Sequence, residues 1–255
     1  MNSNLILNIP HASTWITGVH CVNAVYLAAA HGAFMKMLYE QLLPMTDWYT
    51  DELFINGIGI PIVAPVSRII CDTERFRNDE DEPMAKEGFG VCYSKTYDKK
   101  HTIAWQDFHK DWVLEVLYDT HHRNLELAVD RTLHDHGSAL ILDCHSFSPV
   151  PLPYEPDQDP DRPDICIGTD SFHTPQRLIE KTEEFFRSRG YSVKINSPYG
   201  GTIVPAEHLN RRKNVISIML EINRGLYLKP NTNEKTEYFE TLKQHLAQYE
   251  QAITT

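Results

Sequence analysis

The chain has 255 residues, of which 42% are apolar, so it can bury a proper hydrophobic core, and its length suits one large domain. Its formal net charge of −11 argues against a nucleic-acid partner, because binding to a phosphate backbone needs a basic surface. Small-molecule chemistry and protein contacts are the function classes that remain.

The cysteines and the N-terminal residues indicate the compartment. The five cysteines are odd in number, scattered and without a CxxC pair, which suits a reducing cytosol and excludes a cysteine zinc knuckle. The first residues lack the basic residues of a signal peptide, and no stretch approaches the roughly twenty apolar residues of a membrane helix. We therefore expect a soluble, cytoplasmic protein with no membrane partner.

The first predicted strand ends in a histidine. Leu5–Ile9 is apolar except for one residue, and Pro10 ends it because proline cannot donate a hydrogen bond to a neighbouring strand. His11 then lies at the carboxyl end of the strand. Taken alone, His11 could equally cap the turn that follows.

Two helices come next. Apolar residues recur at helical spacing over residues 33–43, and a short helix is predicted over residues 47–54 with Thr46 as its N-cap. Asp47 and Asp51 are four residues apart and would share one face of this helix. Either could bind a metal ion, or both could simply stabilise the helix N-terminus.

Residues 60–64 and 67–72 are predicted to be extended segments. Alternation in the second segment places Arg68 and Asp72 on one face, where they could form an ion pair. Arg75 follows shortly afterwards. In so acidic a chain, these arginines are candidates for binding a substrate carboxylate, because the guanidinium group matches its two oxygens.

A short strand is predicted over residues 91–94, and one long helix over residues 107–136 that ends at Gly137. His121 and His122 fall in the middle of this helix. We expect both to be surface residues.

The central strand of the predicted sheet also ends in polar residues. The apolar run Ala139–Leu142 is typical of a buried strand, and Asp143, Cys144 and His145 follow it. Open α/β folds bind their ligands at this edge of the sheet, so we predict that His145 is a site residue. A Cys144–His145 dyad is rejected because adjacent strand residues point to opposite faces, and the absence of a Gly-x-Ser-x-Gly turn argues against a serine triad.

The segment Pro149–Pro163 carries six prolines and is predicted to be an exposed loop over the site, with a possible role as a lid. Strands are predicted over residues 165–168 and 191–195, with an amphipathic helix over residues 175–189 between them.

A third apolar strand, Val215–Leu220, ends in Glu221, and a final amphipathic helix is predicted over residues 233–253. A glutamate at the end of such a strand is costly unless it is paired, solvated or near a cation. Strands and helices alternate without an internal repeat or a linker. The sequence therefore predicts a single α/β domain spanning residues 1–255.

The three strand ends together suggest a metal site. They supply His11, His145 and Glu221, and an acid-rich segment begins at Asp47. Two imidazoles and one carboxylate around a divalent ion, with one position open, is the arrangement of catalytic zinc. A further carboxylate that is not a ligand can act as general base, so the set points to hydrolysis of an amide or ester.

Motifs along nearly the whole chain resemble those of the N-formylglutamate amidohydrolase family. They are PHAST (10–14), DWYTDEL (47–53), SRIICDTER (67–75), GFGV (88–91), DCHSFS (143–148), PYGG (198–201) and EINRGLY (221–227). The resemblance implies a fold of the zinc-dependent exopeptidase type, with a mixed, mostly parallel sheet flanked by helices. It also implies hydrolysis of N-formyl-L-glutamate to formate and glutamate, and a place in histidine degradation.

The resemblance also implies roles for particular residues. The metal, expected to be Zn²⁺, would be held by His11, Asp47 and His145, and Glu221 would act as general base and proton donor. Residues implied to bind the substrate carboxylate or line the site are Arg68, Arg75, Asn223, Arg224 and Ser146, followed by Asp170, His122 and Gly201.

Two positions depart from the expected patterns. Thr14 stands where the carboxypeptidase pattern has a glutamate ligand, which leaves Asp47 preferred over Asp51. Glu74 stands where the family usually has asparagine before Arg75 and adds a negative charge beside the arginines. The alternatives are therefore an enzyme acting on another N-acyl amino acid or small peptide, and a non-catalytic ligand-binding relative. In either enzyme reading the partner is a small molecule with a carboxylate, and the oligomeric state is left open.

Overall fold

The computed structural model describes residues 3–16, 28–103 and 107–254, and its centre is a six-stranded sheet. The strand order is β2 (Ile60–Val63), β1 (Leu5–Ile9), β3 (Ala139–Phe147), β6 (Val215–Asn223), β4 (Ile165–Gly168) and β5 (Val193–Ile195). The first four strands are parallel, and β4 and β5 run in the opposite direction. The predicted α/β fold with a mixed, mostly parallel sheet flanked by helices is confirmed.

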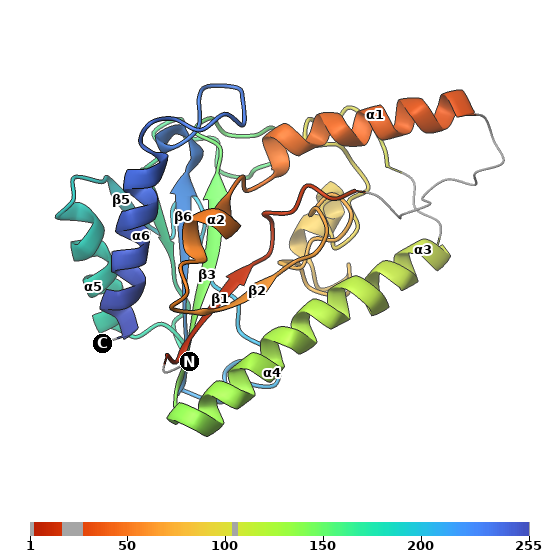
Figure 1. Cartoon of the computed structure of the whole chain (residues 1–255). Coiled ribbons are helices and arrows are strands. Elements are labelled where there is room, and N and C mark those ends of the chain that lie inside the picture. Colours follow the sequence, from red (N-terminus) through yellow and green to blue (C-terminus); the bar gives the residue numbers. More distant parts are fainter. Residues whose placement is uncertain (1–2, 17–27, 104–106, 255) are drawn as a thin grey trace.

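Helices cover both faces of this sheet (Figure 1). On one face lie α2 (Thr50–Phe54), α5 (Gln176–Arg187) and α6 (Phe239–Thr254), and α4 (Asp119–His136) lies on the other. Side chains alternate along β3, so Leu142 and Cys144 belong to the core beneath α5 and α6, whereas Ile141 packs toward α4. Asp143 and His145 therefore face the α4 side of the sheet.

Helix α4 continues a longer helical segment, as the sequence predicts. α3 (Asp107–Trp112) leads into the π-helical segment η2 (Val113–Tyr118) and then into α4. The segment ends at Gly137, which has a φ of 76° and whose N–H bonds to the carbonyl of Leu133. A left-handed residue of this kind is the usual helix ending, and glycine adopts it at little cost.

Residues 67–72 and 91–94 are not strands, so these two predictions are wrong. The amides of Ile70 and Cys71 both bond to the carbonyl of Ser67, which makes a turn. The apolar residues here, Ile69 to Cys71, are buried in a second hydrophobic cluster together with α1 (Ala28–Met45) and η2, outside the sheet. The alternation of apolar and polar residues over 67–72 does not indicate a strand here, because the apolar side chains are buried by this second cluster and not by a neighbouring strand.

Strands β3 and β6 are longer than predicted, with nine residues each. Because they pair along their whole length, the polar residues remain in the ladder, and His145 lies directly opposite Glu221. Cys144 points to the other face, which agrees with the rejection of a Cys–His dyad. By contrast, α6 begins only at Phe239 rather than at residue 233, because Leu228 and Lys235 form an isolated β-bridge before it. The two remaining short helices are η1 (Pro83–Glu87) and η3 (Arg224–Leu226).

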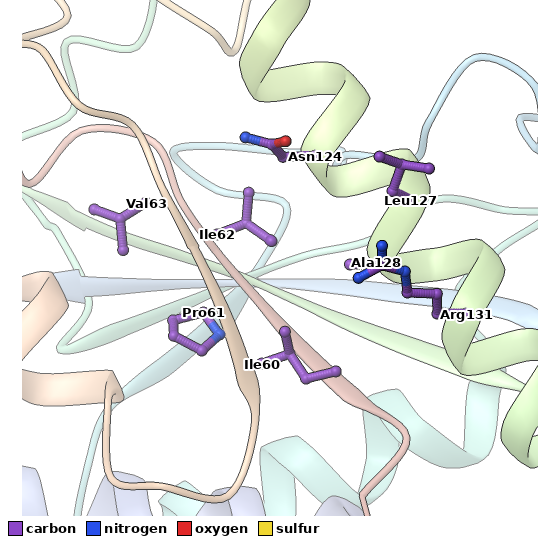
Figure 2. Close-up of a pocket in the computed structure, with 8 residues that line it drawn as sticks. All are labelled: Ile60, Pro61, Ile62, Val63, Asn124, Leu127, Ala128 and Arg131. Carbon is purple, nitrogen blue, oxygen red and sulfur yellow. The ribbon is translucent and has the colours of Figure 1, made fainter. Parts of the chain in front are cut away.

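A shallow cavity of about 430 Å³ lies between the edge strand β2 and α4 (Figure 2). Figure 2 shows its lining, which comes from residues 60–63 of β2 and from Asn124, Leu127, Ala128 and Arg131 of α4. No carboxylate, imidazole or thiol lines it, so it offers no catalytic group. In the described part of the chain, no helix is long and apolar enough to cross a membrane.

Candidate metal and active site

His11, Asp47 and His145 come together in one buried cluster, each no more than 5% exposed. Nδ1 of His11 lies 3.5 Å from Oδ2 of Asp47, and Nδ1 of His145 lies 3.3 Å from the same oxygen. With zinc–ligand bonds of about 2.0–2.2 Å, two ligands of a tetrahedral site are separated by roughly 3.3 Å. Both imidazole nitrogens therefore lie at a distance from the Asp47 oxygen that suits neighbouring ligands of one zinc ion, and all three ligand atoms lie within 4.8 Å of one another.

The sheet and one backbone turn place these ligands. His11 follows β1 and His145 lies in the neighbouring parallel strand β3, so both reach the same edge. Asp47 is held there because its N–H bonds to the carbonyl of His11 at 3.1 Å and its Oδ2 accepts the N–H of Ser146 at 3.1 Å. Two chain segments thus fix the carboxylate between the imidazoles.

The structure separates Asp47 from Asp51. Helix α2 begins only at Thr50, after Tyr49 in the left-handed region (φ 62°), so Asp47 precedes the helix and does not share a face with Asp51. Asp51 is exposed and accepts the N–H of Glu52. The predicted N-cap at Thr46 is wrong, because no side chain caps α2 and the N–H of Thr50 bonds to the carbonyl of Asp47 instead.

Each histidine of the cluster is backed by a second carboxylate. Nε2 of His11 lies 2.9 Å from Asp72, and Nε2 of His145 lies 3.0 Å from Asp143. Such a partner fixes the tautomer and the orientation of a metal-binding imidazole and raises its basicity. Here both imidazoles are held with Nδ1 directed at Asp47.

The carboxylates of this cluster favour the ionised form despite their burial. Burial raises the pKa of Asp47, but the nearby imidazoles of His11 and His145 outweigh it and hold that pKa well below its usual range. For Asp72, burial is outweighed by the positive charges of Arg68 and Arg75. Burial lowers the pKa of His145, yet the charge of Asp143 overcomes it and the net shift is upward. The site therefore attracts positive charge.

Unsatisfied atoms at the centre of the cluster fit a bound cation. Nδ1 of His11 and Oε2 of Glu221 are buried and have no hydrogen-bond partner in the protein. A buried polar atom of this kind is costly unless an ion or water satisfies it. A second group, Glu74, Asp143 and His145, is close enough to hold a metal, but the amide of Asn8 bridges the two carboxylates at 2.7 and 2.8 Å. The first cluster is thus the better candidate metal site.

Glu221 stands beside the cluster. It is 7% exposed and pairs in register with His145, so its side chain lies on the same face of the sheet. Burial raises the pKa of Glu221 to about 8, and the positive charge of His145 opposes this shift. A buried carboxyl next to a potential metal site has the position that a general base needs.

A cavity of about 860 Å³ opens on the cluster, and three arginines line it: Arg68, Arg75 and Arg224. Arg68 bonds to Asp72 at 2.9 Å, and its Nη1 lies 3.9 Å from Asp47. Arg224 donates to the carbonyls of Pro44 and Thr46, which leaves its buried Nε without a partner. These guanidinium groups are held rigidly at the wall.

The other predicted substrate-binding residues differ in position. Ser146 lines the cavity and is buried, with 4% of its surface exposed. Asn223 is not part of the lining, because its amide donates to the carbonyl of Pro163 and its side-chain oxygen accepts the N–H of Gly225. Asp170, His122 and Gly201, which the resemblance also suggested, all line the cavity.

His121 and His122 are not surface residues, so that prediction is wrong. His121 is 2% exposed and lies 2.9 Å from the side-chain oxygen of Asn8, while His122 lies 3.0 Å from the carbonyl of Thr73. His121 turns toward the sheet because α4 packs its inner face there, whereas His122 faces the loop that contains Thr73. The signal was present in the sequence, since His121 falls four residues before Leu125 in the buried stripe of this helix.

The proline-rich segment 149–163 forms one wall of the cavity through Tyr154, Glu155 and Asp157. Glu155 is buried and accepts hydrogen bonds from Arg162 at 2.5 Å and from Tyr199 at 2.8 Å. The sequence pattern did not predict that Glu155 is buried or that it pairs with Arg162 and Tyr199. The bond to Arg162 joins two parts of the segment, and the bonds of Glu155 and Arg162 to Tyr199 tie the segment to the loop after β5.

A buried His–Asp–His cluster with an adjacent glutamate, at the carboxyl ends of parallel strands, fits a hydrolase with an α/β fold. The sequence profile of the N-formylglutamate amidohydrolase family matches residues 3–228. The chain belongs to this family.

Individual relatives agree with this placement. The chain is 26% identical to an N-formylglutamate deformylase of Pseudomonas putida over 260 aligned positions, covering 98% of this chain and 88% of that protein. An N-formylglutamate amidohydrolase from Ralstonia eutropha JMP134 has a similar fold, with a TM-score of 0.76, 23% identity and coverage of 99% and 93% of the two chains. The gene product Atu2144 from Agrobacterium tumefaciens is also similar, with a TM-score of 0.65, 16% identity and coverage of 100% and 93%. Because both identities are below 25%, these two solved structures are evidence for the fold alone.

Proposed function

We propose that this protein is a metal-dependent amidohydrolase that cleaves the amide bond of an N-acyl amino acid, namely N-formyl-L-glutamate, to give formate and glutamate. The observation that carries the proposal is the convergence of His11, Asp47, His145 and Glu221 on one buried site within the arginine-lined cavity. Membership of the family supports the same substrate.

In this proposal His11, Asp47 and His145 hold one divalent ion. Two imidazole nitrogens and one carboxylate favour zinc, since its catalytic sites use three protein ligands of these types. When bound, the ion supplies Lewis acidity to the amide carbonyl and to water. Asp72 and Asp143 keep the two imidazoles in the binding orientation.

Glu221 acts as the general base. It accepts a proton from the attacking water and then donates that proton to the leaving amide nitrogen. Pairing with His145 across adjacent strands, about 4.8 Å apart, places Glu221 within reach of a water at the cluster. A nearby dication would favour its ionised form and so counter the effect of burial on its pKa.

Arg68, Arg75 and Arg224 bind the carboxylates of the substrate. Their guanidinium groups line the same cavity as the cluster, and Arg224 has an unpartnered donor there. Because planar guanidinium groups bind carboxylates in a bidentate manner, they orient the amide as well as attract the substrate.

The test is metal analysis of the purified protein combined with turnover of N-formyl-L-glutamate, with and without chelator. We expect about one metal ion per chain and loss of turnover with chelator. Glu221→Gln should keep the metal and lose about 10²–10⁴-fold in kcat/KM. The exposed Glu207→Gln serves as matched control and should change neither.

Full turnover by Glu221→Gln would show that the assigned base is wrong. Normal metal content with no turnover by the wild-type protein would favour the other possibility, a ligand-binding relative without catalysis. Retention of stoichiometric metal by His145→Ala at ordinary affinity would remove His145 from the ligand set.

A further inference from the structure

We propose that the active-site cavity contains a subsite for an apolar acyl chain, so that N-acyl amino acids with acyl groups of several carbons bind better than the N-formyl compound. This inference rests on the proposed function and specifies its substrate class. The structural basis is a wall of the cavity that we call the apolar wall, formed by Ile203, Val204, Leu209 and Met219.

The apolar wall is built onto the catalytic residues. Met219 lies two residues before Glu221 in β6 and so shares its face of the sheet, about 6.6 Å along the strand. The N–H of Ile203 donates to Oδ2 of Asp143 at 3.1 Å, and the other oxygen of Asp143 holds His145. An acyl group attached to an amide at the cluster would therefore reach this wall directly.

The apolar wall is also a packed surface. Met219 is 7% exposed and Val204 is 9% exposed, while Leu209 lies at the rim with 38%. Gly168 pairs with Met219 in the adjacent strand, and a Cβ atom there would collide with the Met219 side chain. The absence of a side chain at Gly168 thus makes room for the methionine.

The positions of the arginines indicate which end of the substrate faces the apolar wall. The lining residues within 198–210, together with Met219, include no arginine or lysine, whereas Arg68, Arg75 and Arg224 come from other segments. The carboxylates of an N-acyl amino acid would bind the arginines with the scissile amide at the cluster. The acyl group is then the part that remains for the apolar wall.

The size of the cavity supports the same assignment. Cavities of about 300–1,000 Å³ enclose drug-sized ligands, and this one measures about 860 Å³. A formyl group has one carbon and would leave the apolar wall without a contact. Each buried methylene adds favourable transfer free energy, so a longer chain that covers Met219 and Val204 gains affinity.

The test measures binding without turnover. N-formyl-L-glutamate and N-butanoyl-L-glutamate are titrated calorimetrically into metal-loaded Glu221→Gln, and KM for both is measured with the wild-type protein. We expect the butanoyl compound to have a Kd at least tenfold lower than the formyl compound, and a lower KM.

A charge on the wall should remove this preference. Leu209→Lys, at a position exposed enough to tolerate the change, should reduce the ratio of the two Kd values to near one. Leu127→Lys makes the same substitution on α4, outside this cavity, at 45% exposure, and should leave the ratio unchanged.

Equal or weaker binding of the butanoyl compound would overturn the inference even if N-formyl-L-glutamate is hydrolysed, and the proposed function would stand. Tighter butanoyl binding without hydrolysis of either compound would support the subsite and overturn the proposed function. An unchanged ratio in Leu209→Lys would show that the preference does not arise from this wall.

Discussion

At the scale of single residues, the candidate site is organised by pairs of hydrogen-bonded side chains. His11 and His145 would each be free to rotate or change tautomer, but Asp72 and Asp143 hold Nε2 of each ring and leave Nδ1 for Asp47. Asp72 is itself paired with Arg68, so the metal cluster and the arginine wall share one carboxylate. Under the proposed function, we therefore expect metal binding and binding of the substrate carboxylate to be coupled through Asp72.

We predict that Asp143→Asn weakens metal binding by about 10–100-fold, because the partner of His145 loses its charge while its shape is kept. Metal affinity is measured by competition with a chromogenic chelator. Asp119→Asn, which removes the same charge from a surface pair with Arg77, should have no effect. An affinity for metal within a factor of two of wild type in Asp143→Asn would contradict the role assigned to Asp143.

At the scale of elements, the proline-rich segment 149–163 is irregular, as predicted, and still firmly held. Six prolines limit its backbone freedom, and the pair of Glu155 with Arg162 has side chains only 4% and 2% exposed. Arg162 also lies over the rings of Phe147 and Tyr199. The proposed lid role stays a prediction, and any opening would have to break this buried pair.

We predict that Arg162→Ala lowers the free energy of unfolding by about 3–5 kcal/mol, because it leaves the Glu155 carboxylate buried without its charged partner. Urea unfolding measures the change. Lys229→Ala breaks an exposed pair with Glu234 and should cost no more than about 1 kcal/mol. A loss below about 1 kcal/mol in Arg162→Ala would mean that the segment does not depend on this pair.

At the scale of the whole molecule, one buried acid on the opposite face of the sheet from the candidate site couples stability to pH. Glu250 in α6 is fully buried, and burial raises its pKa from 4.5 to about 8 against the opposing effect of the nearby Asn56 side chain. The folded protein therefore binds a proton that the unfolded chain releases between these pH values. This contribution to stability is complete below about pH 4.5 and is lost as the pH rises to about 8.

We predict that Glu250→Gln is more stable than wild type at pH 8 by on the order of 2–4 kcal/mol, since a shift of one pKa unit corresponds to about 1.4 kcal/mol. The difference should shrink toward zero at pH 4.5. Chemical unfolding of both proteins across this range measures it. Exposed Glu240→Gln on the same helix is the control, and a difference between Glu250→Gln and wild type that does not vary with pH would refute the assignment to Glu250.

The order of strands and helices was largely predictable because it follows from local patterns. Apolar runs such as Leu5–Ile9 and Ala139–Leu142 predict buried strands whichever partners they have. The long helix through α4 was equally clear from its periodicity and from Gly137 at its end. The local pattern of residues 67–72 wrongly predicts a strand, because their burial in the second hydrophobic cluster depends on residues distant in the sequence.

The sequence by itself determined the α/β class and the three strand ends that carry His11, His145 and Glu221. Only the tertiary structure showed that Asp47, and not Asp51, lies beside the two histidines. It also showed that His121 is buried beside Asn8 and that Asp72 and Asp143 lie behind the histidines. The physical reason is how far apart in the sequence the interacting residues lie. Strand and helix patterns arise from neighbours within a few residues, whereas a ligand set depends on which distant segments pack at the same edge of the sheet.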